Sequence, residues 1–311
     1  MMNHEEVAMR SAFGETLVEL ADVYPEMVVL DADVSSSTQT VHFGMKYPDR
    51  FFNVGVAEAG MVDMAGGMAT AGLRPVVSAF AIFLSLKATD QVRNVICYNN
   101  LPVILVGGYA GLSDSFDGAS HQSISDLAIM RAMPNLKVMV PADSVEMKQS
   151  LQLALKEKGP VYIRSSRNPS PVLFEHEEQM NPGRIRKIRE GKDVTIAVCG
   201  IPTFMAIEAS EQLAEAGISV DLLEVSTLKP LDRETLLKSV RKTGRILTVE
   251  EHNVIGGLGG AIAEVLGNHH PVPVKNIGIK DTFTETGPYD ELLRKYGIST
   301  GHIVEEIIKW Q

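Results

Sequence analysis

The chain has 311 residues, a formal net charge of −10, and 45% hydrophobic against 22% charged residues. This length allows two domains with cores of their own, and the composition is that of an ordinary soluble globular protein. The acidic balance argues against a general nucleic-acid-binding or anionic-membrane-binding surface, although it allows a local basic pocket. The start Met-Met-Asn-His-Glu-Glu lacks the features of a signal peptide, and no apolar run approaches the roughly eighteen residues of a membrane span, so we expect a cytoplasmic protein.

Both cysteines, Cys97 and Cys199, lie in apolar segments. We therefore expect buried free thiols in a reducing compartment. The sequence contains no CxxC or HExxH pattern. It therefore predicts no metal site formed by this chain alone.

In the first half, short apolar runs alternate with longer segments of helical period. The predicted strands are 27–30, 75–78, 102–106, 136–140 and 161–164, and the predicted helices are 5–23, 58–71, 82–99, 124–133 and 144–156. Such alternation predicts a parallel sheet with helices on both faces, and ligands bind beyond the carboxyl ends of its strands. Asp33, Phe80, loop 107–121 and Arg167 fall at or after such ends.

The second half repeats this alternation after a segment rich in Pro, Glu and Arg. The predicted strands are 194–198, 219–223, 245–249 and 274–277, and the predicted helices are 203–216, 233–240, 259–266, 289–296 and 303–308. We predict an α/β fold of two doubly wound domains with mainly parallel sheets. Residues 1–170 form the first domain, 171–192 the linker, and 193–311 the second domain.

Glu58 opens a helix of small and apolar residues, and two phenylalanines, Phe80 and Phe83, follow about twenty residues later. The acid either interacts only with the helix dipole or binds a buried group, because a buried carboxylate needs a hydrogen-bonding partner. The phenylalanines either pack in the core or offer a flat surface. Together they suggest half of a cofactor site, with an acid for a ring nitrogen and an aromatic surface for the ring.

Two polar segments are further candidates. Asp117 and His121 lie in a loop after a predicted strand. They have a functional role there, in binding a polyhydroxylated substrate or in shuttling protons, or they only form a capped turn before the next helix. Arg164 and Arg167 flank two serines and suit either a phosphate or carboxylate, or a surface salt bridge.

The glycine-rich stretch 256–260 follows a predicted strand and opens a helix. It lacks the spacing and the acidic residue of a dinucleotide fingerprint, so we expect it to serve close packing. The sequence also has no Walker A pattern.

In combination and order, these segments resemble transketolase from its middle to its C-terminus. The resembling segments are 8–14, 30–33, 35–38, 48–51, 55–58, 78–83, 90–93, 117–122, 163–167, 228–232 and 244–252. The Gly-Asp-Gly start and later Asn with which that family binds the cofactor diphosphate are not found here. The chain is therefore similar to the second subunit of a split transketolase.

The resemblance implies thiamine diphosphate, shared with a separate N-terminal subunit that also binds Mg²⁺ or Ca²⁺. It implies self-association through the pyrimidine-binding domain, giving a homodimeric core flanked by two partner chains. Glu58 would hydrogen-bond ring nitrogen N1′ of the aminopyrimidine and thereby promote ionisation of the thiazolium carbon. Phe80 and Phe83 would stack on the pyrimidine, and Asp33 would lie at the edge of the cofactor pocket.

The substrate residues also follow from the resemblance. Asp117 and His121 would bind substrate hydroxyls, with His121 also catalytic. Arg10, Ser37 and Arg167 would hold the far end of the substrate, usually a sugar phosphate, and a sulfonate would satisfy the same arginines. The sequence departs from the family at Tyr109, where many members have a phosphate-end histidine, and at Leu86, where some have tyrosine.

Two alternatives remain beside transketolase activity in sugar-phosphate metabolism. One is a subunit similar to deoxyxylulose-phosphate synthase or to the beta chain of 2-oxoacid dehydrogenases. The other is a non-catalytic regulatory or scaffold relative.

Overall fold

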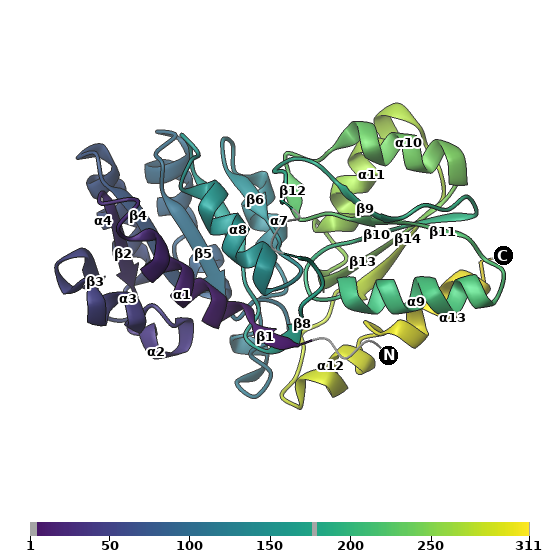
Figure 1. The fold of residues 1–311 in the computed structure, drawn as a ribbon, viewed down its shortest axis with the longest axis horizontal. Coiled ribbons are helices and arrows are strands. Elements are labelled where there is room, and N and C mark those ends of the chain that lie inside the picture. Colours follow the sequence, from purple (N-terminus) through teal and green to yellow (C-terminus); the bar gives the residue numbers. More distant parts are fainter. Residues whose placement is uncertain (1–4, 176–178, 311) are drawn as a thin grey trace.

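The computed structural model describes residues 5–175 and 179–310, and it contains two mainly parallel sheets (Figure 1). The larger sheet has seven strands in the order β12-β6-β7-β5-β4-β2-β3, and the second has five in the order β14-β13-β10-β11-β9. The edge strands β12 and β9 pair antiparallel with their neighbours, and the other pairs within these two sheets are parallel. The predicted fold class is confirmed.

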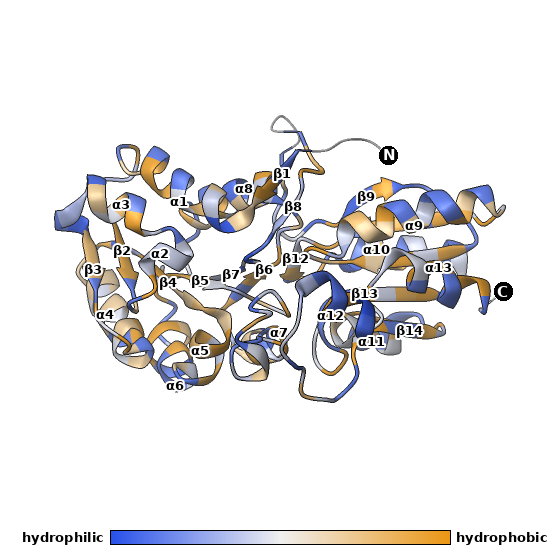
Figure 2. Ribbon diagram, turned by 90° about the horizontal axis from the view of Figure 1, so that it is seen from below, coloured by the Kyte–Doolittle hydropathy of each residue, from blue (hydrophilic) through white to orange (hydrophobic). Residues whose placement is uncertain are grey.

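The larger sheet is covered on both faces (Figure 2). Its own strands are β2 (Met27–Asp31), β3 (Phe51–Asn53), β4 (Arg74–Phe80), β5 (Ile104–Gly108), β6 (Lys137–Met139) and β7 (Val161–Arg164). One face carries α1 (Met9–Leu20), α3 (Val41–Lys46) and α8 (Ser144–Ala154), and the other carries α4 (Glu58–Thr70), α5 (Ala81–Leu86), α6 (Thr89–Gln91) and α7 (Asp126–Ala132). Neighbouring strand residues such as Val29 and Leu30 enter different core clusters, because successive side chains point to opposite faces. This two-sided burial explains the unbroken apolar runs in the sequence.

The second sheet has the same layered arrangement (Figure 1). Its strands are β9 (Arg186–Arg189), β10 (Val194–Val198), β11 (Val220–Glu224), β13 (Ile246–Asn253) and β14 (Val274–Ile279). One face carries α10 (Arg233–Thr243) and α11 (Leu258–His269), and the other carries α9 (Thr203–Glu215), α12 (Tyr289–Lys295) and α13 (Thr300–Ile308). Strand β9 lies within 171–192, the segment predicted as linker, so part of that segment belongs to the second sheet. The exact domain boundaries stay a prediction.

The two sheets are joined by β12 (Thr227–Lys229), which leaves the second half of the chain and pairs with β6 at the edge of the larger sheet. A single core cluster also spans both halves, with Leu127 of α7 and Leu258 of α11 among its buried members. A further small sheet pairs β1 (Glu6–Ala8) with β8 (Pro169–Pro171). Strand β12 and this shared core therefore hold the two halves of the chain against each other.

Two predicted helices differ from the structure. The helix predicted at 5–23 begins only at Met9, because residues 6–8 form β1. The helix predicted at 82–99 is divided into α5, α6 and the π-helical segment η2 (Val92–Cys97). At the turn between α5 and α6, the Thr89 hydroxyl donates to the Ser85 carbonyl, a local contact that competes with regular helical hydrogen bonding.

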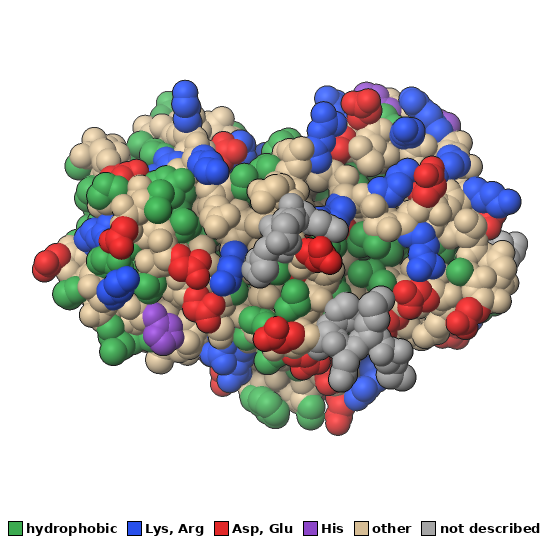
Figure 3. Space-filling view, viewed as in Figure 1, with side chains coloured by type: hydrophobic (Ala, Val, Ile, Leu, Met, Phe, Trp, Pro, Cys, Tyr) green, Lys and Arg blue, Asp and Glu red, His purple; other side chains and the backbone are tan. Residues whose placement is uncertain are grey.

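The exterior carries charges of both signs. Acidic and basic side chains are interspersed on the face seen in Figure 3. Within the described residues, no helix is both long enough and apolar enough to cross a membrane. Cys97 and Cys199 are both free and buried, as predicted, and burial raises the pKa of the Cys97 thiol to about 11.

Candidate active site

Glu58 is the first residue of α4, and it is only 3% exposed. Its Oε2 accepts a hydrogen bond from Nζ of Lys87, with 2.6 Å between the two atoms. Lys87 caps the end of α5, and its Nζ lies 4.7 Å from the ring centroid of Phe83. Sequence reasoning missed Lys87, although its position four residues after Phe83 in a predicted helix indicated that the two side chains share a face.

Phe80 and Phe83 form a continuous aromatic surface with Tyr109 and His121. The rings of Phe80 and Phe83 are stacked with centroids 6.0 Å apart and 21° between their planes. Tyr109 stacks on Phe80 at 4.3 Å and 19°. The His121 ring stands edge-on to Phe83 at 5.3 Å. The aromatic surface therefore extends from β4 and α5 to the loop after β5, which carries Tyr109 and His121.

Tyr109 is buried and has a backbone φ of +58°, in the left-handed region that a bulky residue rarely adopts. Its hydroxyl accepts from Nη1 of Arg10 at 3.0 Å and donates to the carbonyl of Ser37 at 3.4 Å. Arg10 also donates to this Ser37 carbonyl at 3.2 Å. Ring stacking and these hydrogen bonds hold Tyr109 in its strained conformation.

Arg167 lies on the same tyrosine, with its Cζ 5.1 Å from the Tyr109 ring centroid. Its Nη1 is 3.3 Å from Oδ1 of the fully buried Asp114. Arg10, Ser37 and Arg167, predicted from three distant segments, thus meet around Tyr109 and form what we call the two-arginine site. Nε of Arg10 is buried and has no hydrogen-bond partner among the described residues, so this guanidinium retains donor capacity for an anion.

Asp117 and His121 lie beside the two-arginine site. Burial, together with the neighbouring Asp117 carboxyl, raises the pKa of Asp114 to about 6. The Nδ1 of His121 is 2.9 Å from the Ser120 hydroxyl.

Asp33 lies near the segment that leads to Glu58 and away from the other polar site residues. It has a φ of +67°, and its Oδ1 accepts from the Asn53 side chain at 3.2 Å. Asn53 in turn accepts from the amide of Gly55, at the start of the segment that leads to Glu58. Asp33 therefore contacts the approach to Glu58 and not the two-arginine site.

Arg164 is paired with a buried acid in the interior, whereas Arg167 lies in the two-arginine site. Its Nε is 2.9 Å from Oδ2 of Asp126, which also accepts from the Tyr162 hydroxyl at 2.8 Å. Burial favours the neutral acid, but the interactions with Arg164 and His252 and the hydrogen bonds from Arg164 and Tyr162 together outweigh this and lower the pKa of Asp126. Arg164 also donates to the Glu251 carbonyl at 2.8 Å, which links β7 to β13. The salt-bridge alternative holds for Arg164, in the interior and not at the surface.

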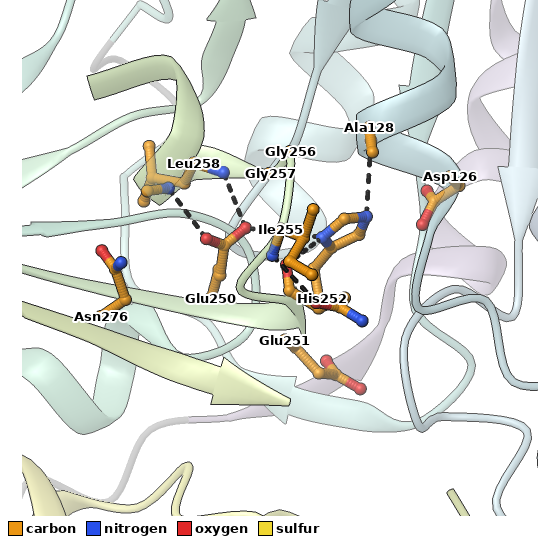
Figure 4. Close-up of polar contacts among 12 residues, drawn as sticks. Asp126, Ala128, Glu250, Glu251, His252, Ile255, Gly256, Gly257, Leu258 and Asn276 are labelled. Carbon is orange, nitrogen blue, oxygen red and sulfur yellow. Dashed lines mark hydrogen bonds and ion pairs between the residues drawn. The ribbon is translucent and has the colours of Figure 1, made fainter. Parts of the chain in front are cut away.

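The glycine-rich stretch surrounds a carboxylate of the chain itself, as Figure 4 shows. Glu250 accepts from the amides of Leu258 at 2.7 Å and Gly259 at 2.8 Å, at the start of α11. A Cβ added at Gly257 would lie 1.9 Å from Oε2 of Glu250. The expected close-packing role of this stretch is confirmed, since the chain's own acid occupies the place where a phosphate would bind.

Comparisons with known proteins agree with this geometry. The sequence pattern of the transketolase pyrimidine binding domain matches residues 5–171, and that of the transketolase C-terminal domain matches residues 183–303. The chain belongs to the transketolase family. Its two halves correspond to the pyrimidine-binding and C-terminal domains, and thus to the C-terminal section of a split transketolase.

Relatives of this transketolase-family chain span nearly all of it. It is 42% identical to a putative transketolase C-terminal section of Methanocaldococcus jannaschii, over 97% of this chain and 95% of that protein. It is 38% identical to the 6-deoxy-6-sulfo-D-fructose transketolase subunit SqwH of Clostridium sp. (strain MSTE9), over 96% and 93%. A solved structure described as a split gene transketolase, inactive beta4 tetramer, is 44% identical, with a TM-score of 0.90 and 98% of each chain covered.

A pyrimidine-binding domain of this family implies thiamine diphosphate as the cofactor. The site in this transketolase-family chain fits one part of that group. A buried carboxyl, Glu58, beside the stacked rings of Phe80 and Phe83 suits a planar ring that carries a basic nitrogen.

Proposed function

We propose that the chain is the C-terminal subunit of a thiamine-diphosphate-dependent transketolase that moves a two-carbon ketol unit from a ketose to an aldose. A separate N-terminal subunit would bind the diphosphate and its divalent metal ion. The main support is that Glu58, the aromatic surface and the two-arginine site lie at one end of the larger sheet. In that arrangement an acid for the cofactor ring and cations for a substrate anion flank the same rings.

The cofactor, when bound, supplies the chemistry that cleaves a carbon–carbon bond next to a ketose carbonyl. Glu58 would hold its ring nitrogen N1′, and a buried setting strengthens such a hydrogen bond. Phe80 and Phe83 would orient the ring by stacking. Asp33 would fix the segment that carries Glu58 at the edge of the pocket.

The substrate would be held at two places. Asp117 and His121 would bind its hydroxyls beside the aromatic surface, and His121 would also move a proton at a hydroxyl. Arg10 and Arg167, with Ser37, would hold its anionic end. Contacts with that distant end would supply binding energy that orients the reacting carbon.

The decisive experiment substitutes Glu58→Gln in the complex with the N-terminal subunit, thiamine diphosphate and magnesium. We expect ketol transfer from xylulose 5-phosphate to ribose 5-phosphate to fall about a hundredfold or more, since the amide cannot share a proton with N1′. Glu215→Gln, at an exposed position of α9, is the matched control and should keep full activity. Undiminished activity of the Glu58→Gln complex would exclude the proposed role.

The same assay separates the alternatives. Pyruvate decarboxylation without ketol transfer would assign the chain to the synthase-like or dehydrogenase-like class. Absence of both reactions in a fully assembled, cofactor-loaded complex would favour a non-catalytic relative.

A ketose with a sulfonate end is a second candidate substrate. The two-arginine site contains the neutral Tyr109 hydroxyl, and Asp114 offsets part of the Arg167 charge, so the site suits a monoanion. A relative 38% identical is named for a sulfosugar. Comparing kcat/KM for 6-deoxy-6-sulfofructose and fructose 6-phosphate as donors would distinguish the two classes.

A further inference from the structure

The ion pair between Glu58 and Lys87 joins the proposed cofactor acid to a lysine to which the proposed function gives no role. The buried carboxylate accepts from Nζ of Lys87 at 2.6 Å. The side chain of Lys87 is 48% exposed, whereas that of Glu58 is 4% exposed. The pair is therefore asymmetric: the acid is fixed in the interior, and the lysine reaches it from the solvent side.

The Lys87 ammonium makes both contacts that the proposed function assigns to the pyrimidine ring. It donates to the Glu58 carboxylate, and it lies 4.7 Å from the Phe83 ring centroid, where its charge interacts with the ring face. A planar heteroaromatic ring bound to Glu58 and stacked beside Phe83 would need the same space. Lysine and ring therefore compete for one position.

The ammonium also acts against the chemistry proposed for Glu58. The carboxylate oxygen that accepts from Lys87 belongs to the group that must share a proton with a ring nitrogen. A lysine that stayed on Glu58 would weaken this sharing. Lys87 can leave at modest cost, because it stands at the end of α5 with a flexible, half-exposed side chain.

We propose, on the basis of the function proposed above, that Lys87 is a displaceable counter-ion: it fills the aminopyrimidine position in the free chain and turns out to solvent when the cofactor ring binds. Lys87 is thus a positioning residue that holds the Glu58 carboxylate in place until the site is occupied. Cofactor binding must break one charged hydrogen bond, and this lowers the apparent affinity.

The first test measures thiamine diphosphate binding by calorimetry, with magnesium, on the chain assembled with its N-terminal subunit. Lys87→Met should tighten binding about tenfold, because a hydrogen bond to a charged group no longer has to be broken. Lys87→Arg keeps the charge and should bind no more tightly than wild type. The matched control is Lys46→Met, since Lys46 is an exposed lysine over a tyrosine ring, 5.2 Å from its centroid, and its loss should change nothing. Unchanged or weaker binding by Lys87→Met would overturn the proposal.

The second test measures stability instead of activity, first in the free chain and then in the complex. A thermal-unfolding cycle of Lys87→Met, Glu58→Gln and the double variant should reveal coupling between the two residues, because Lys87→Met leaves a buried charge unpaired. The same cycle in the cofactor-loaded complex should show the coupling lost. Coupling that persists there would mean that Lys87 stays on Glu58, which contradicts displacement.

The outcomes also separate this inference from the proposed function. If the assembled complex binds thiamine diphosphate and Glu58→Gln impairs that binding while Lys87→Met does not tighten it, only the counter-ion proposal fails. If Glu58→Gln leaves both binding and ketol transfer unchanged, the proposed function of the site fails, and the counter-ion proposal fails with it.

Discussion

Tyr109 is the residue at which the aromatic surface meets the two-arginine site. Its ring stacks on Phe80, while its hydroxyl contacts Arg10 and the Ser37 carbonyl. A neutral phenol stands here where many transketolases have histidine, so this position donates or accepts a hydrogen bond without adding a positive charge. Its strained φ of +58° indicates that the surrounding contacts define its orientation.

Tyr109→Phe keeps the stacked ring and removes only the hydroxyl to which Arg10 donates. In the assembled enzyme we expect KM for a ketose phosphate donor to rise about threefold to tenfold, the cost of roughly one hydrogen bond. kcat/KM for erythrulose, which has no anionic end, should stay unchanged. Tyr98→Phe, at an exposed position, is the control. An equal loss with both donors would show that the hydroxyl does not serve the anionic end.

At the scale of elements, the start of α11 shows why a glycine-rich stretch need not bind phosphate. Glu250 of β13 points at the first amides of the helix and satisfies two of them. Burial raises the pKa of Glu250, and contacts with His252 and the two amides oppose this rise. The absence of a side chain at Gly257 leaves room for the Glu250 carboxylate, so this stretch allows close packing of the strand against the helix.

Gly257→Ala should destabilise the free chain by about 1–3 kcal/mol, since its Cβ would lie 1.9 Å from a carboxylate oxygen that is held by the helix amides. Gly267→Ala, in the same helix, is the control. A Cβ at Gly267 would meet no described atom within 4 Å, and alanine should stabilise the helix by about 0.5–1 kcal/mol. Urea unfolding of both variants measures the difference. A Gly257→Ala protein as stable as wild type would contradict this account of the glycines.

At the scale of the molecule, helix α4 offers a face for self-association. Helix α4 runs from Glu58 along the outer face of the larger sheet, where α5 and α6 also lie (Figure 2). Met64 of α4 is 42% exposed, and Gly60 and Gly67 lie on the same side of the helix with open space at their Cβ positions. Leu86 on α5 is exposed as well. Small and apolar residues thus occupy this face, with the exposed Asp63 at its edge, and such a face suits close contact with a second copy of the chain.

Met64→Glu should therefore weaken self-association of the free chain, because it places a charge in the centre of an apolar contact. Ile255→Glu, at an apolar position in the other half of the chain that is 60% exposed, is the control. Sedimentation velocity over a range of concentrations would measure the dissociation constant, for which we expect an increase of tenfold or more for Met64→Glu. A wild-type chain that sediments as a monomer, with and without its partner, would refute the premise.

The sequence determined much of the fold and the membership of the site. Buried parallel strands are apolar on both faces, so their positions and the α/β class could be predicted from runs and periods. Glu58, the phenylalanines and Arg167 stood out by residue type and position, and Arg10 was selected through the resemblance to transketolase. Their roles in cofactor and substrate binding stay predictions.

Only the tertiary structure decided which of these residues contact one another. Arg164 and Arg167 are three positions apart, yet one is paired with Asp126 in the interior and the other lies on Tyr109. Lys87 and Glu58 are 29 positions apart in the sequence, and the packing of α5 beside α4 brings them together. Local propensity fixes elements, whereas contacts between elements depend on sheet order and on the competition for buried hydrogen bonds, which no local pattern records.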